Sequence, residues 1–179
     1  EVTDIYGNSA SCDFNVTVVD AEAPSITCPA NITVSAPAGG CGRNVNYTPP
    51  VGTDNCSGAV TQQIGGTGPN SFFPVGTFTE TYFVADGQGF TDTCSFTITV
   101  EDNEAPVITC PTNIVTGNDF GSCGALVAFS APFGTDNCGS APVVQLAGQA
   151  SGTFYNVGTT VQTFAVTDST GNGDTCTFT

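Results

Sequence analysis

Short runs of alternating apolar and polar residues recur along the whole chain, and clusters of Gly, Pro, Asn and Asp separate them. The clearest run is 93–100, in which Cys94 and every second residue up to Val100 are apolar and the others are Ser or Thr. Because successive side chains of a β-strand point to opposite faces, this pattern predicts a strand with one buried face.

Three further runs predict strands of the same kind. The runs 25–28 and 44–47 alternate regularly, and the first places Cys28 on its apolar face. The run 77–84 is less regular, because Glu80 falls in phase with its apolar residues. We expect Glu80 to lie at the rim of a sheet, where a carboxylate can reach water.

The chain repeats itself with a period of 82 residues, and no insertion or deletion is needed to keep the register. The cysteines show the period in four sets, which are Cys12, Cys94 and Cys176; Cys28 and Cys110; Cys41 and Cys123; and Cys56 and Cys138. We expect 1–19 to be the C-terminal strands of an upstream repeat, 20–101 to be a complete repeat, and 102–179 to be a second, slightly truncated repeat.

About seven short strands in each repeat predict a two-sheet sandwich of immunoglobulin-like type. The expected fold class is therefore all-β, with tandem immunoglobulin-like β-sandwich repeats of 82 residues. Linkers of only a few residues between the repeats favour an extended array.

Nine cysteines without His and without C-x-x-C pairs indicate disulfides in an oxidising, extracellular compartment, and they argue against zinc. The first and last strands of such a sandwich are often neighbours, which predicts the disulfides Cys28–Cys94 and Cys110–Cys176. The remaining cysteines are then predicted to pair within each repeat, as Cys41–Cys56 and Cys123–Cys138. Cys12 is the last cysteine of the upstream repeat.

The charge is one-sided, with 16 acidic residues, a single base and a formal net charge of −15. Such a chain repels nucleic acid and anionic membranes, and no apolar run is long enough to span a bilayer. With no His and no Lys, and with every candidate carboxylate recurring at the repeat period, we expect no catalysis.

Acidic residues recur in the linker that enters each repeat and in two loops that a seven-strand sandwich places at the same end. They are Asp20, Glu22, Asp54 and Asp86 in the first repeat, and Asp102, Glu104, Asp136 and Asp168 in the second. Because Ca²⁺ prefers oxygen ligands, we hypothesise a Ca²⁺ site at each inter-repeat junction, the only cofactor that the sequence suggests. The alternative is that these residues simply shape turns, which suits Asp86 before a Gly-rich hairpin.

Sequons for N-glycosylation occur at Asn15, Asn31 and Asn46, and a fourth occurs at Asn55 beside Cys56. None recurs at the equivalent position of the second repeat, and such matches arise by chance in a Thr-rich chain. Glycosylation of Asn15, Asn31 and Asn46 is therefore a weak hypothesis.

Five stretches of the complete repeat carry recognisable motifs, which are Ala23-Pro24-x-Ile26-x-Cys28-Pro29, Thr53-Asp54-Asn55-Cys56, Phe73-Pro74-Val75-Gly76-Thr77, Val84-Ala85-Asp86-x-x-Gly89 and Cys94-x-Phe96-x-Ile98-x-Val100. In this combination the chain resembles the HYR (hyalin repeat) family over essentially its whole length. The resemblance implies an immunoglobulin-like extracellular module of cell adhesion and matrix, without catalysis. Many family members keep only the outer cysteine pair, which agrees with the pairing of Cys28 and Cys94.

We therefore expect a non-enzymatic structural and adhesive element of an extracellular or cell-surface fibre, whose partners are neighbouring repeats or other copies of itself. One alternative is an adhesion module that binds surface glycans or proteins. It predicts an exposed aromatic patch, for which the candidates are Phe72, Phe73, Phe154 and Tyr155. Another alternative is a spacer within a large secreted enzyme.

Overall fold

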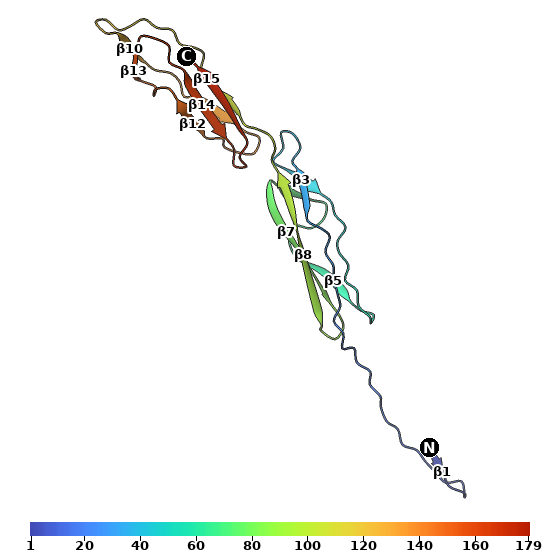
Figure 1. Ribbon diagram of the computed structural model, residues 1–179. Helices are drawn as coiled ribbons and strands as arrows, with labels where there is room; N and C mark the ends of the chain where they lie inside the picture. Colours follow the sequence, from blue (N-terminus) through green and yellow to red (C-terminus); the bar gives the residue numbers. More distant parts are fainter.

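The computed structural model describes residues 1–179 and shows two β-sandwiches placed end to end, behind an extended N-terminal tail (Figure 1). The tail forms only a short hairpin of β1 (Val2–Thr3) and β2 (Ser9–Ala10), and residues 11–19 lie outside any strand. There is no helix in the structure, and hence no helix that could cross a membrane.

The first sandwich has a sheet of four strands facing a sheet of two. The larger sheet has the order β3 (Ile32–Ser35), β8 (Thr91–Glu101), β7 (Gly76–Ala85) and β5 (Val60–Gly65). In this sheet β3 runs parallel to β8, and the other pairs are antiparallel. The smaller sheet pairs β4 (Gly42–Val45) with β6 (Ser71–Pro74). These two layers form the immunoglobulin-like sandwich that the sequence predicted.

The second sandwich repeats this plan with seven strands. Its sheets are β12 (Val143–Ala147), β14 (Gln162–Thr167) and β15 (Gly173–Phe178); β10 (Gly124–Val127) with β13 (Thr153–Asn156); and β9 (Val107–Thr109) with β11 (Phe133–Thr135). In the first sandwich a single bridge between Ser25 and Thr53 takes the place of the β9–β11 pair. The run 25–28 is therefore less regular than the sequence predicted.

Aromatic and β-branched side chains from both layers fill the core of the first sandwich. Phe73 of β6 and Ile98 of β8 are fully buried, and Tyr47 packs edge-on against Phe96 with ring centroids 5.0 Å apart. Each such side chain contributes roughly 1.5–3 kcal/mol by leaving water. The alternating residues of 93–100 face this core, as predicted.

Glu80 lies inside the first sandwich, so the prediction of a rim position was wrong. Its side chain is fully buried, and its carboxylate accepts hydrogen bonds from Tyr47 Oη and Gln63 Nε2, both at 2.8 Å. The backbone N–H groups of Thr67 and Gly68 donate at 2.8 and 3.0 Å. Burial is the main cause that raises the pKa of Tyr47, so its hydroxyl stays protonated and able to donate. These four donors replace the water that the carboxylate loses.

The second sandwich places Gln162 at the position equivalent to Glu80, and this side chain is 2% exposed. Its Oε1 accepts a hydrogen bond from Gln145 Nε2 at 2.9 Å, and its Nε2 donates to Tyr155 Oη at 3.2 Å. Both repeats thus keep a hydrogen-bonded polar group inside the core.

Candidate functional site

A disulfide closes each sandwich between its first segment and its last strand. Cys28 is bonded to Cys94 with their Cα atoms 5.6 Å apart, and Cys110 is bonded to Cys176 with a Cα separation of 5.9 Å. These are the two pairs that the sequence predicted.

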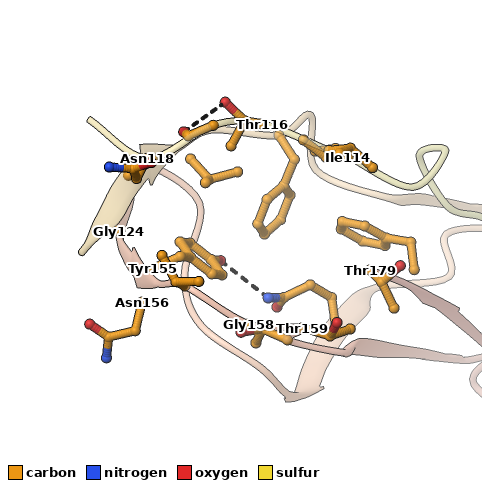
Figure 2. A pocket seen from close by; sticks show the side chains of 18 residues that line it. Ile114, Thr116, Asn118, Gly124, Tyr155, Asn156, Gly158, Thr159 and Thr179 are labelled. Carbon is orange, nitrogen blue, oxygen red and sulfur yellow. Dashed lines mark hydrogen bonds between the residues drawn. The ribbon is translucent and has the colours of Figure 1, made fainter. Parts of the chain in front are cut away.

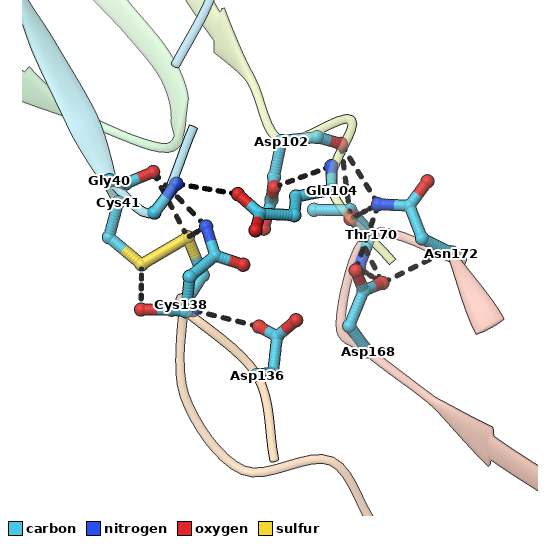
Figure 3. Close-up of a disulfide and its surroundings, with 11 residues drawn as sticks. Gly40, Cys41, Asp102, Glu104, Asp136, Cys138, Asp168, Thr170 and Asn172 are labelled. Carbon is cyan, nitrogen blue, oxygen red and sulfur yellow. Dashed lines mark hydrogen bonds between the residues drawn. A yellow bond between two sulfur atoms is a disulfide. The ribbon is translucent and has the colours of Figure 1, made fainter. Parts of the chain in front are cut away.

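The third disulfide joins one repeat to the next. Cys41 of the first repeat is bonded to Cys138 of the second, with their Cα atoms 4.9 Å apart (Figure 3). The prediction of Cys41–Cys56 and Cys123–Cys138 bonds was therefore wrong. Cys12, Cys56 and Cys123 are exposed thiols.

The predicted bonds within each repeat fail because their cysteines lie at opposite ends of a sandwich. Cys41 immediately precedes β4 at the end that faces the second repeat. Cys56 lies at the entry end, where its sulfur is within 4.8 Å of carboxylate oxygens of Asp20 and Asp54. The chain between Cys41 and Cys56 runs along the sandwich, so the two cannot meet.

Polar contacts surround the inter-repeat disulfide (Figure 3). Glu104 of the linker accepts a hydrogen bond from the backbone N–H of Gly39 at 2.6 Å. Asn137 Nδ2 donates to the carbonyl of Gly40 at 3.2 Å, and Cys41 Sγ lies 2.9 Å from the carbonyl oxygen of Asn137. The sequence pointed to Glu104, but it did not identify Gly39, Gly40 or Asn137. The only available signal was that Gly39 and Asn137 recur as Gly121 and Asn55.

Two carboxylates at this junction have oxygens that are buried and lack a hydrogen-bond partner. Asp102 is 5% exposed; one of its oxygens accepts from the Glu104 N–H at 3.1 Å, and the other has no partner. Asp136 accepts from the Cys138 N–H at 2.8 Å, and its second oxygen also has no partner. Asp102, Asp136 and Cys138 each offer a donor atom within 4.8 Å of the others.

Asp168 shapes the turn that follows β14. Its carboxylate accepts hydrogen bonds from the backbone N–H groups of Thr170, Gly171 and Asn172 at 2.7–2.9 Å. Desolvation acts to raise the pKa of Asp168, but hydrogen bonds from Asn172 and Thr170 outweigh it and lower the value to about 2. Asn172 Nδ2 also donates to the carbonyl of Asp102 at 3.0 Å, which ties this turn to the linker.

Asp86, the equivalent residue of the first repeat, accepts from the N–H groups of Gln88, Gly89 and Phe90 at 2.7–2.9 Å. Asp86 and Asp168 therefore do what the turn hypothesis proposed for them. One oxygen of Asp86 is buried without a partner.

The entry end of the first repeat carries the same acidic group as the junction. Asp20, Asp54 and Cys56 each offer an atom within 4.8 Å of the others, and Asn55 donates to Glu22 at 2.8 Å. The backbone N–H of Glu22 is the main cause that lowers the pKa of Asp20. A hydrogen bond to Asp20 is the main cause that raises the pKa of the Cys56 thiol.

A hollow of about 450 Å³ lies between the two layers of the second sandwich, lined by Ile114, Thr116 and Phe178 among others (Figure 2). In the first sandwich the equivalent Ile32 pairs with Ile98 of β8, and Ile98 fills the core there. The counterparts of Ile98 and of the β8 residues after it lie beyond the printed sequence, so we assign no ligand to this hollow.

The aromatic candidates do not share one environment. Phe73 is fully buried, Tyr155 is half-buried inside its sandwich, and Phe72 and Phe154 are 58% and 45% exposed. The three sequon residues Asn15, Asn31 and Asn46 are all exposed. Asn31 also uses its Oδ1 to accept from the Thr97 N–H at 2.9 Å.

A family model described as the HYR domain matches residues 19–100 and again residues 101–179. Among curated proteins, Hyalin of Strongylocentrotus purpuratus is 39% identical over 168 residues, which is 92% of this chain and 14% of that protein. Hyalin of Lytechinus variegatus is 36% identical over 179 residues, 96% of this chain and 32% of that protein. The chain thus spans less than a third of either relative.

A more distant relative is the sushi, von Willebrand factor type A, EGF and pentraxin domain-containing protein 1 of Rattus norvegicus, at 31% identity over 88% of this chain and 4% of that protein. Among solved structures, the extracellular domain of protocadherin gammaB4 aligns with 87% of this chain and 32% of its own chain, at 13% identity and a TM-score of 0.40.

Proposed function

Because this chain belongs to the HYR domain family, we propose that it is a non-enzymatic, adhesion-related element of an extracellular or cell-surface fibre. The observation that carries the proposal is the Cys41–Cys138 disulfide, which fixes two sandwiches end to end. A covalent bond between neighbouring repeats limits bending at the linker, as a fibre requires. Disulfides of this kind persist outside the reducing cytosol.

The surface charge supports the same role. Sixteen acidic residues against one base give every repeat a negative surface, which keeps such arrays soluble and apart. Partners that carry the array at its ends, including other copies or surface glycans and proteins, belong to the same proposal. Exposed Phe72 and Phe154 are too far apart in the two repeats to make one aromatic patch, which favours the fibre over a glycan-binding face.

Electron microscopy of the native protein tests this proposal. Long, thin filaments whose bending increases after reduction would support it, because reduction cuts the bond between neighbouring repeats. Compact particles in which the repeats occupy one arm of a larger enzyme would contradict it and would favour the spacer alternative.

A second proposal is that the junction binds Ca²⁺ between Asp102 and Asp136. Their unpartnered oxygens are buried, and a carboxylate oxygen buried without a partner costs free energy unless a cation or a donor compensates it. Ca²⁺ takes six to eight oxygen ligands, and backbone carbonyls and water can complete such a set. The bonded Cys138 sulfur is the poorest ligand of the group, whereas Asp168 is already committed to its turn.

Isothermal titration with Ca²⁺ tests this second proposal. We expect D136N to weaken binding at least tenfold, whereas D13N, which removes the same charge from the exposed tail, leaves it unchanged. Equal loss in both variants would show that Ca²⁺ is only a diffuse counter-ion.

A further inference from the structure

Both halves of the inter-repeat junction occur a second time in this chain, at its outer ends. Cys138 receives the bond from the preceding repeat, and its equivalent 82 residues earlier is Cys56. Cys41 gives the bond to the following repeat, and its equivalent is Cys123. Cys56 and Cys123 are two of the exposed thiols.

The entry end of the first repeat has the geometry of the receiving half. Asp54 accepts from the Cys56 N–H at 3.2 Å, as Asp136 accepts from the Cys138 N–H at 2.8 Å. Asp20 completes the group around Cys56, as Asp102 does around Cys138. The receiving half is therefore formed by each repeat on its own.

The exit end of the second repeat has the geometry of the giving half. Gly39 precedes Cys41 with a φ of 72°, and Gly121 precedes Cys123 with a φ of 75°. Both values lie in the left-handed region that favours glycine, so the two turns are the same.

The hydrogen bonds of the two exit turns also correspond. The carbonyl of Cys41 accepts from the Val75 N–H at 3.1 Å, and that of Cys123 accepts from the Val157 N–H at 3.0 Å. Cys123 is thus held at the end of its sandwich, as Cys41 is held in the bonded junction.

We propose that Cys56 and Cys123 each form a disulfide with the adjacent repeat of the same polypeptide, so that one disulfide crosses every junction of the array. Cys56 bonds the exit cysteine of the repeat before it, and Cys123 bonds the entry cysteine of the repeat after it. This inference rests on the proposed tandem array, which supplies those repeats. The partner is thus a further HYR repeat that presents the same turn or the same acidic entry group.

Each bond forms from two thiols, which lose two protons and two electrons as the S–S bond is made. An external disulfide, such as glutathione disulfide or the disulfide of an oxidoreductase, takes up the electrons and is reduced to two thiols. Cys56 and Cys123 cannot satisfy each other within this chain, because they lie at the outer ends of two sandwiches placed end to end (Figure 1).

The parent test uses the full chain with C12S, which removes the tail thiol. After refolding with glutathione disulfide, free thiols are blocked with N-ethylmaleimide, and the unreduced chain is digested for mass spectrometry. We expect a linked Cys41–Cys138 peptide, with Cys56 and Cys123 both blocked. A linked Cys41–Cys56 peptide would overturn the inference.

The decisive test uses the same chain with residues 20–101 duplicated in tandem, the second copy carrying S57T as a mass marker. Ser57 is exposed and makes no hydrogen bond, so the marker leaves the fold unchanged. The duplication adds four cysteines, yet we expect the number of blocked thiols to stay at two. The new linked peptide should join Cys41 of the first copy to Cys56 of the marked copy.

Four blocked thiols, or a linked peptide within one copy, would overturn the inference. A linked Cys28–Cys94 peptide in every sample confirms that each repeat has folded. Because this test needs only three repeats in solution, it can succeed even if microscopy shows no filaments, so its outcome is separable from that of the fibre proposal.

Discussion

At the scale of single residues, the molecule uses carboxylates mainly as internal hydrogen-bond acceptors. Glu80 gathers four donors inside the first core, and Asp168 gathers the N–H groups of one turn. A strongly acidic composition is often attributed to solvation alone, but here part of it is structural.

Replacing Glu80 with alanine should destabilise the first repeat. We expect E80A to lower the free energy of unfolding by about 2–4 kcal/mol, because the buried donors of Tyr47, Gln63 and Gly68 lose their acceptor. Urea unfolding followed by circular dichroism measures the change. E101A removes an exposed carboxylate of the same repeat and should cost less than about 0.5 kcal/mol; an equal loss in both variants would contradict the role assigned to Glu80.

The turn at Asp168 should weaken in acid. Its pKa in the folded protein, about 2, is below the ordinary value of 3.8, so the carboxylate stabilises the turn above pH 4 and that stabilisation is lost as the pH falls from about 4 to 2. A carbon-detected NMR titration should give a midpoint near 2, and amide exchange at Gly171 should accelerate over the same interval. A midpoint at or above 3.8 would disprove the prediction, and D168N should abolish the pH dependence.

At the scale of strands and turns, alternation of apolar and polar residues located the main strands, because a two-layer sandwich buries one face of each. It failed at Glu80, since the acceptor role depends on Tyr47 and on a turn at Thr67–Gly68 that come from other parts of the chain. The pattern could not foresee that these donors converge on one point.

The cysteine pairing failed for a different reason. In an array with a fixed period, Cys138 occupies the position of Cys56 shifted by one repeat, so a bond from Cys41 to either gives the same sequence pattern. Only the shape of the sandwich decides between them, because it puts Cys41 and Cys56 at opposite ends. The acidic residues of the junction were predictable by contrast, because they recur in the linker and in loops at one end of the fold.

A glycine allows the segment after β4 to approach β7 closely. A Cβ atom added at Gly52 would lie 2.5 Å from Val84 Cγ2, and one at Gly134 would lie 2.6 Å from Val166 Cγ2. We expect G52A to lower the free energy of unfolding of the first repeat by roughly 1–3 kcal/mol through overpacking. In G87A the new methyl group meets no atom within 4 Å, so this variant should unfold like the parent; similar losses in both would point to hairpin effects instead.

At the scale of the whole molecule, the inter-repeat disulfide should control flexibility more than stability. The double variant C41S/C138S leaves the outer disulfides Cys28–Cys94 and Cys110–Cys176 in place. We expect both sandwiches to unfold at nearly the parent urea concentration.

Small-angle X-ray scattering of the double variant should show a broader distribution of the distances between the repeats. A distribution identical to that of the parent would mean that Glu104 and Asn137 alone hold the junction. A large loss of stability would instead make the disulfide a component of the fold.

The position of the cysteines also determines how such an array would carry tension. With a disulfide across every junction, the shortest covalent path enters the second repeat at Cys138 and leaves it at Cys123, so it includes only the backbone between these two residues. Fully stretched, that path spans roughly 50 Å per repeat, whereas a complete 82-residue repeat would pay out roughly 280 Å. A pull on the fibre would therefore bypass the core strands β14 and β15, and the array would behave as a tether that resists lengthening instead of a spring that unfolds.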